Sequence, residues 1–140
     1  MPESFQFKRR IRFADTNPSG SVHFDVYVRL MEETEYAFLR SRGLRVVLND
    51  GKGIIGFPRL MAELEILEPL VLDELAETTL RLVEENGKSI VYEFEVHCQQ
   101  QLAATGKFEV ACCRFPDGEN PYAILIPEFV LEKLSDRSDG

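Results

Sequence analysis

Residues 11–40, IRFADTNPSGSVHFDVYVRLMEETEYAFLR, join the end of a strand-like run to a long amphipathic segment through a polar turn. The turn covers residues 15–20, DTNPSG, where asparagine, proline and glycine favour a sharp change of chain direction. The pattern predicts a helix that begins near His23 or Phe24 and ends at about Ser41, before the stop signal Gly43. The free backbone N–H groups of such a helix start suit a developing oxyanion. This stretch is therefore a candidate catalytic segment.

Composition places the chain among globular proteins. Its 140 residues fit one domain, and a hydrophobic fraction of 44% with 10 phenylalanines supports a packed core. The net charge of −8 and the pI of about 4.8 argue against nucleic acid or an anionic membrane as partner. No apolar run approaches about 18 residues, and the N-terminus MPESFQFKRR has no apolar signal core. We therefore expect a soluble, cytoplasmic protein.

The three cysteines, Cys98, Cys112 and Cys113, lack the spacing of metal ligands. Neighbouring residues of a strand point to opposite faces, so Cys112 and Cys113 are unsuited to a shared metal or a disulfide. We expect reduced thiols that behave as small hydrophobic side chains, and no metal site.

The rest of the chain reads mainly as strands. Phenylalanines and isoleucine alternate with charged residues over residues 4–13, and Asn86-Gly87 is a strong hairpin signal. Residues 44–56 are punctuated by glycines and predict a short helical turn followed by a loop. The remaining predicted elements are strands at residues 57–67, 74–84, 88–98 and 102–115 and a helix at 127–134. This order predicts an α+β domain in which an antiparallel sheet wraps one long helix.

The segment FADTNPSGSVHFDVYVRLMEETEYAFLR resembles the hotdog-fold acyl-CoA thioesterases of the 4-hydroxybenzoyl-CoA thioesterase type. The strands of PRLMAELEILEPLVLDELAETTLRLVEENGKSIVYEFEV resemble the next part of that family, and the resemblance covers about residues 5–115. It implies a single hotdog domain over residues 1–140 that hydrolyses a thioester without a cofactor. The residues that match the family's motif in order and spacing are Phe13, Asp15, Gly20, Val22, Phe24, Tyr27 and Glu32.

The resemblance also implies catalytic residues. In the family a second aspartate of the turn attacks the thioester or activates water, and Asn17 stands at that position here. An amide is no nucleophile or general base at neutral pH, but it can orient a water or the thioester oxygen. The Phe24 N–H would polarise the carbonyl, and Glu32 would serve as base or as a contact of the acyl group. Tyr27 would line the pocket.

Other residues are candidates for substrate binding. His23 stands at the helix start and could pair with Asp25 or Glu32. The family contacts coenzyme A phosphates from the turn between the outer strands, which makes Lys88 the carried-over candidate and Arg59 a second one. The acidic chain has little general attraction for a polyanionic nucleotide, so an acyl group on a carrier protein is also open.

Three functional alternatives follow from Asn17. The chain is an acyl-CoA thioesterase, or a non-catalytic protein that binds acyl-CoA or acyl-carrier protein. The third is a thioesterase of the kind that serves polyene and enediyne polyketide synthases, whose turn reads Glu-Thr-Asn; Asp15-Thr16-Asn17 resembles it, although Glu35 replaces that group's helix arginine. Asn17 before Pro18 also suits a purely structural Asx turn. Relatives pair edge to edge, so we expect a homodimer or homotetramer with shared active sites.

Overall fold

The computed structural model describes residues 4–135 and contains two α-helices, one 3-10 turn and nine strands in that range. The helices are α1 (Phe24–Ser41) and α2 (Glu128–Leu134), and the 3-10 turn η1 covers Phe13–Asp15. The strands are β1 (Ser4–Arg10), β2 (Val47–Asn49), β3 (Ile54–Gly56), β4 (Arg59–Ile66), β5 (Leu75–Glu85), β6 (Ser89–Cys98), β7 (Gln101–Ala111), β8 (Cys113–Phe115) and β9 (Tyr122–Ala123).

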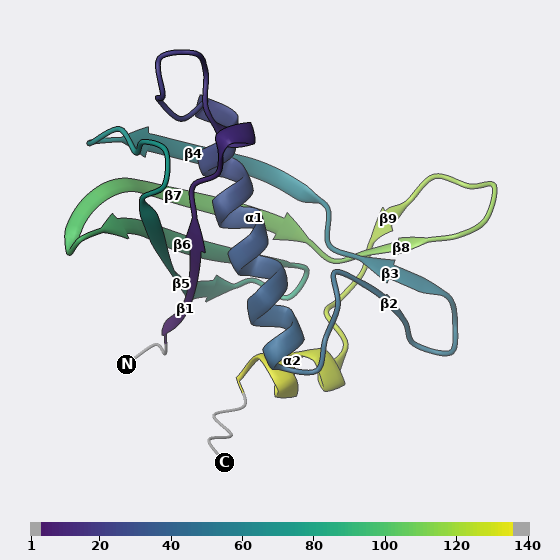
Figure 1. Ribbon diagram of the computed structural model, residues 1–140. Helices are drawn as coiled ribbons and strands as arrows, with labels where there is room; N and C mark the ends of the chain where they lie inside the picture. Colours follow the sequence, from purple (N-terminus) through teal and green to yellow (C-terminus); the bar gives the residue numbers. More distant parts are fainter. Residues whose placement is uncertain (1–3, 136–140) are drawn as a thin grey trace.

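A five-stranded antiparallel sheet carries the long helix on one face. Its strand order is β1-β5-β6-β7-β4, and Figure 1 shows α1 running across the sheet with β1 beside it. A smaller sheet of order β2-β3-β8-β9 projects to one side, and α2 lies near the C-terminal end of α1. The predicted α+β architecture of one sheet around one long helix is confirmed.

Helix α1 packs closely against the sheet because its apolar stripe continues for the full length of the helix. The stripe includes Val26, Leu30 and Met31 near its start, and each of them is at most 1% exposed. The closest approach is at Gly106 of β7, where a Cβ atom would lie 2.5 Å from the Met31 sulfur and 3.0 Å from the backbone oxygen of Glu63. Glycine at this position therefore sets how near the helix comes to the sheet.

The opposite face of the sheet is charged. Cross-strand pairing places Glu63, Lys107, Glu93 and Arg81 side by side on β4, β7, β6 and β5. Their neighbours along the strands, including Phe94 and Phe108, are buried under α1. The period-two pattern of these strands thus divides a buried face from a polar one.

The predicted helix and the Asn86-Gly87 hairpin are confirmed, but residues 44–56 differ from the prediction. These residues form the hairpin β2–β3, with Leu48 paired to Ile55, in place of a helical turn and a loop. Strand β3 gains its second partner from β8, where Gly56 pairs with Cys113. The hairpin is therefore stabilised by a segment more than fifty residues away in sequence.

Three other elements differ from the prediction. The first strand ends at Arg10, because residues 13–15 form the 3-10 turn. The strand predicted over 102–115 is divided at the buried Cys112 into β7 and β8, which belong to different sheets. Strand β9 was missed. The C-terminal helix is confirmed at Glu128–Leu134 with Pro127 as its N-cap.

All three cysteines are free thiols, and they lie in the described range. Among residues 4–135, no helix is long and apolar enough to cross a membrane.

Candidate active site

Asn17 uses its side-chain oxygen to build the turn that precedes α1. Oδ1 accepts hydrogen bonds from the Ser19 N–H at 3.0 Å, the Ser19 hydroxyl at 2.6 Å and the Ser21 N–H at 3.3 Å. Gly20 completes the turn with φ +91°, a conformation that L side chains rarely adopt. Because two of the three donors are backbone N–H groups, the oxygen of the amide must face the turn. The side-chain amino group has no hydrogen bond among the described residues, so its two N–H donors are available.

Helix α1 begins without a side-chain cap. His23 is the N-cap residue, and its side chain makes no capping hydrogen bond to the helix. The Val26 N–H turns back to the His23 carbonyl at 3.0 Å, which leaves the Phe24 N–H at the open end. His23 is exposed, and the Phe24 side chain is 62% exposed. The helix start therefore presents a free backbone donor and a positive dipole end to solvent.

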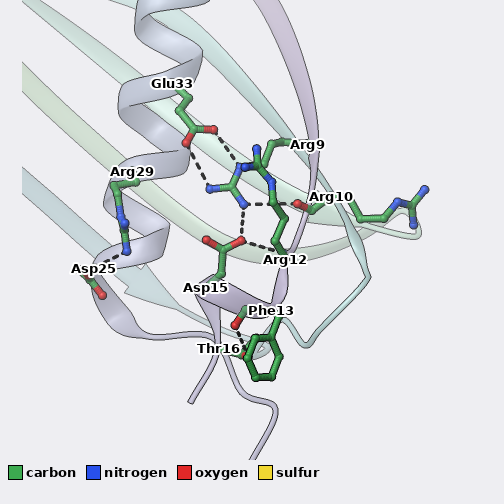
Figure 2. A network of polar contacts seen from close by, with 9 residues as sticks. All are labelled: Arg9, Arg10, Arg12, Phe13, Asp15, Thr16, Asp25, Arg29 and Glu33. Carbon is green, nitrogen blue, oxygen red and sulfur yellow. Dashed lines mark hydrogen bonds and ion pairs between the residues drawn. The ribbon is translucent and has the colours of Figure 1, made fainter. Parts of the chain in front are cut away.

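An ionic network ties this turn to the side of α1 (Figure 2). The Arg9 guanidinium donates two hydrogen bonds to the Glu33 carboxylate, at 3.0 and 3.2 Å, and a further one to Asp15 Oδ2. Asp15 Oδ2 also accepts the Arg12 N–H at 2.7 Å, and the Asp15 carbonyl accepts the His23 N–H at 3.2 Å. Arg9 of β1 thus connects Glu33, in the middle of α1, to Asp15, whose carbonyl is bonded to the N-cap residue His23.

Asp15 stays ionised in this setting. Burial raises the pKa of its carboxyl, but the hydrogen bonds from the Arg12 N–H and from the Arg9 guanidinium outweigh burial and lower the pKa below its usual value. A carboxyl with a lowered pKa stabilises the fold at neutral pH, and this stabilisation is lost when the pH falls through the folded-state pKa. Asp15 is therefore an acceptor that holds the turn.

Tyr27 lies below the helix start rather than in an open pocket of this chain. It is 1% exposed, and its hydroxyl oxygen accepts the Leu70 N–H at 2.8 Å. The Leu70 carbonyl in turn accepts the Val22 N–H at 3.3 Å. Tyr27 thus anchors the loop before β5 beneath the candidate catalytic segment.

Glu32 and Arg59 lie together, but at a different place. The Arg59 guanidinium contacts Glu32 Oε2 at 3.4 Å and Glu35 Oε1 at 3.0 Å, and the Tyr36 hydroxyl donates to Glu32 Oε2 at 3.3 Å. The Arg59 Cζ atom also lies 4.0 Å from the centre of the Phe108 ring. With two carboxylates and a ring around it, Arg59 is poorly placed to bind a phosphate.

Glu35 is the most buried charged group of this cluster, at 1% exposure. Burial raises the pKa of its carboxyl, and the hydrogen bond and charge of Arg59 counter that effect only in part. Burial also raises the pKa of the neighbouring Tyr36 hydroxyl, and the charge of Glu32 adds to this increase. Arg59 thus provides the positive charge that offsets the burial of the Glu35 carboxylate.

The seven predicted site residues do not meet in one chain. Glu32 lies about 12 Å beyond Phe24 along α1, at 1.5 Å rise per residue, so it cannot reach a water at the helix start of its own chain. Lys88 follows the far end of β5, whereas the turn adjoins its first residues, a separation of roughly 33 Å at 3.3 Å per residue. Asn17, His23 and Phe24 therefore form one group, Glu32 and Arg59 form a second, and Lys88 stands alone. The seventh residue, Tyr27, is buried and bonded to the Leu70 N–H.

Two buried ionic groups were missed by the sequence reasoning, although the sequence contains a signal for each. Arg9 continues the inward-facing series of Phe5 and Phe7 on β1, and Glu35 follows Tyr27 and Met31 at helical spacing on the buried stripe of α1. A charged residue at an apolar position of a periodic pattern predicts a buried ion pair. In the described part of the chain, no cluster of three or more His, Cys, Asp or Glu side chains has the arrangement of a metal site.

Comparison with known proteins identifies the family. Residues 11–134 match the model of the thioesterase-like superfamily. The chain belongs to this superfamily. A protein of Aquifex aeolicus named "putative esterase" is 30% identical to this thioesterase-family chain over 132 residues, which cover 94% of the chain and 98% of the relative.

Solved structures share the fold. A 1,4-dihydroxy-2-naphthoyl-CoA thioesterase from Synechocystis superposes with a TM-score of 0.84 at 18% identity, covering 96% of this chain and 98% of its own. A mutant 4-hydroxybenzoyl-CoA thioesterase complexed with 4-hydroxybenzoyl-CoA has a TM-score of 0.80 at 21% identity, with coverages of 94% and 99%. At these identities the two structures show the hotdog fold and no more. Membership of the superfamily makes the chain a thioester hydrolase.

Proposed function

We propose that this protein hydrolyses acyl-CoA thioesters to a carboxylic acid and free CoA at the start of α1. The observation that carries the proposal is the uncapped helix start, where the Phe24 N–H is free beside a polar turn. Such a donor binds charge that develops on the thioester oxygen in the transition state. Superfamily membership and the CoA thioesters named in the two structural relatives support acyl-CoA as the substrate class.

In the proposed mechanism, Asn17 is a donor and not a base. The thioester oxygen accepts hydrogen bonds from the Phe24 N–H and from the Asn17 side-chain amino group, since Oδ1 of Asn17 is occupied by the turn. Water attacks the carbonyl carbon, the carbon–sulfur bond breaks, and the thiolate of CoA receives a proton. Holding the carbonyl between fixed donors replaces the reorganisation that water would need.

The base of this reaction comes from a second copy of the chain in our proposal. Glu32 of the same chain lies too far from Phe24, but its position is well held, because Oε2 contacts both Tyr36 and Arg59. Glu32 is 34% exposed, and Oε1 has no contact among the described residues. Arg59 is the first residue of the edge strand β4, so pairing of two chains along β4 would bring this cluster to the interface.

Strand β4 is the edge that suits a homodimer. Among residues 4–135 it pairs with β7 alone, and Leu60, at its start, is 61% exposed. Arg59 holds Glu32 and Glu35 in this proposal and does not contact the substrate. Lys88 would contact CoA only in such an assembly, where Lys88 of one chain would serve the site of the other. A homotetramer could then form from two such dimers.

Leu60→Glu is expected to convert a dimer into monomers and to lower hydrolysis of acyl-CoA at least tenfold. The carboxylate would have to be desolvated within the pairing edge, which opposes association. The matched control is Val47→Glu, on the exposed face of β2 at 55% exposure. Sedimentation equilibrium and steady-state hydrolysis measure both effects. A Leu60→Glu protein that remains a fully active dimer would show that β4 is not the interface.

The function itself is tested by hydrolysis of a panel of aryl, short, medium and long acyl-CoAs, with release of the CoA thiol as the readout. We expect turnover with at least one class. Binding of CoA esters by calorimetry with no turnover across the panel would favour the non-catalytic alternative. Turnover of the same acyl group only when it is attached to an acyl-carrier protein would instead favour the polyketide-type carrier thioesterase.

A further inference from the structure

The network of Arg9, Asp15 and Glu33 ties together three segments of the chain through their side chains. Arg9 belongs to β1, Asp15 to η1 and Glu33 to the middle of α1. Glu33 lies ten residues beyond the N-cap His23, or about 15 Å along the axis at 1.5 Å per residue. Figure 2 shows the Arg9 guanidinium between the two carboxylates, with Asp15 on the side of the turn and Glu33 on the side of the helix.

This network is built more like an interior contact than a surface ion pair. The side chains of Arg9 and Asp15 are 10% and 9% exposed, and Glu33 is 37% exposed. The bond to Glu33 is bidentate, a geometry that fixes the guanidinium plane as well as its position. A further Arg9 N–H bonds to the Arg10 carbonyl at 3.3 Å. The Arg9 guanidinium is therefore held in one orientation, and this orientation fixes where the Asp15 carboxylate can accept its hydrogen bond.

Asp15 links Arg9 to the proposed oxyanion site through two groups, its side-chain carboxylate and its backbone carbonyl. Its carboxylate accepts the Arg12 N–H, which fixes the start of the 3-10 turn, and its carbonyl accepts the His23 N–H, directly before Phe24. Two residues later, Asn17 begins the turn that returns the chain to the helix, with the Asn17 N–H bonded to the Ser21 carbonyl at 2.9 Å. The path from Arg9 to both proposed donors is thus short and continuous.

We propose that Arg9 is a positioning residue for hydrolysis, which fixes the turn of Asn17 and the helix start at Phe24 against the body of α1. Arg9 does not touch the substrate in this scheme; it acts through Asp15. The assignment rests on the proposed function of the helix start, and it deepens that function by naming what holds the two donors in register. A misplacement of about 1 Å at such a site costs on the order of 100-fold in rate.

The test compares Arg9→Met with Arg114→Met. Arg114 makes a bidentate pair with Asp50, at 2.8 and 3.1 Å, with side chains 16% and 13% exposed, but it lies in the small sheet. It therefore matches Arg9 in charge, burial and geometry without touching the turn. Arg9→Met is expected to lower kcat on the best acyl-CoA of the panel 10- to 100-fold with KM changed less than threefold. Arg114→Met is expected to leave both unchanged at a temperature where each variant is folded.

Amide hydrogen exchange provides a readout that does not depend on turnover. In Arg9→Met the His23 and Arg12 amides are expected to exchange at least tenfold faster than in the parent protein, since both donate to Asp15, while the same amides in Arg114→Met keep their protection. Glu33→Gln, at a half-exposed position, is expected to accelerate exchange of these amides and to lower kcat by smaller factors than Arg9→Met does. Arg9→Lys should restore part of the amide protection and part of kcat. It keeps the positive charge but cannot make the bidentate hydrogen bond to Glu33.

The outcomes separate this inference from the function on which it rests. Faster exchange of His23 and Arg12 together with a fall in kcat supports it. Unchanged exchange of these amides in Arg9→Met overturns it, whether or not the protein hydrolyses acyl-CoA. If exchange accelerates but kcat of an active enzyme is unchanged, the register of the turn is not needed for hydrolysis and the positioning role is wrong. A parent protein without turnover refutes the proposed function instead, and exchange alone then decides whether Arg9 holds the helix start.

Discussion

Replacing Asn17 with alanine is expected to lower kcat for the preferred acyl-CoA by about 100-fold, the usual loss when one oxyanion donor is removed. The physical reason is that the side-chain amino group of Asn17 has no hydrogen bond among residues 4–135, whereas Oδ1 accepts three bonds from Ser19 and Ser21. The loss should appear in kcat and in kcat/KM alike, because the bond forms chiefly to the developing oxyanion. Steady-state kinetics across the acyl-CoA panel measures it.

Asn17→Asp is the matched control for this role. A carboxylate has the same shape and keeps the three hydrogen bonds of the turn, but it has no N–H to donate and brings negative charge toward the oxyanion. We therefore expect Asn17→Asp to lose kcat as Asn17→Ala does, while its thermal unfolding stays close to that of the parent protein. A gain in rate would contradict the donor role, because it would mean that a carboxylate at this position catalyses the reaction better than an amide.

The long helix and the main sheet could be predicted because their signals are local. An apolar stripe, a glycine stop and the Asn86-Gly87 turn each act over a few residues, and the helix bounds Phe24–Ser41 follow the sequence closely. The hairpin β2–β3 could not be found in this way. Its strands have three residues each, too few for an alternating pattern, and it depends on pairing with β8 far along the chain.

The candidate site was predicted only in part. The turn and the helix start belong to one continuous segment, so the sequence places Asn17, His23 and Phe24 together. Glu32 lies on the same helix as Phe24, so their separation of about 12 Å follows from the sequence once the helix is predicted. Whether Lys88 reaches the helix start depends on distances across the sheet, which no spacing in the sequence encodes. Arg9 is hard to predict for a different reason: charged side chains usually face solvent, but β1 places Arg9 on the same side as Phe5 and Phe7.

Arg59→Met is expected to destabilise the protein by about 3 kcal/mol at pH 7, the lower end of the range for breaking a buried ion pair. The side chain of Glu35 is 1% exposed, so without Arg59 its charge would remain buried beside Glu32 with no cation. Arg59 itself is 28% exposed, which places the loss at the lower end. Chemical denaturation at fixed protein concentration measures the free energy of unfolding. The matched control is Arg29→Met, which breaks the exposed pair with Asp25 and should change it by less than about 0.5 kcal/mol.

The pH dependence of this loss identifies its cause. The folded-state pKa of Glu35 is already raised above its unfolded value by burial, and removing Arg59 raises it further. A carboxyl with a raised pKa binds its proton more tightly in the folded state, so the stability of Arg59→Met should increase as the pH falls from 7 through that pKa. The double variant Arg59→Met, Glu35→Leu removes the stranded charge and should recover most of the stability at pH 7, with little pH dependence left. If the single variant were equally unstable at pH 5 and pH 7, the loss would come from the packing of Arg59 on Phe108 and not from the charge of Glu35.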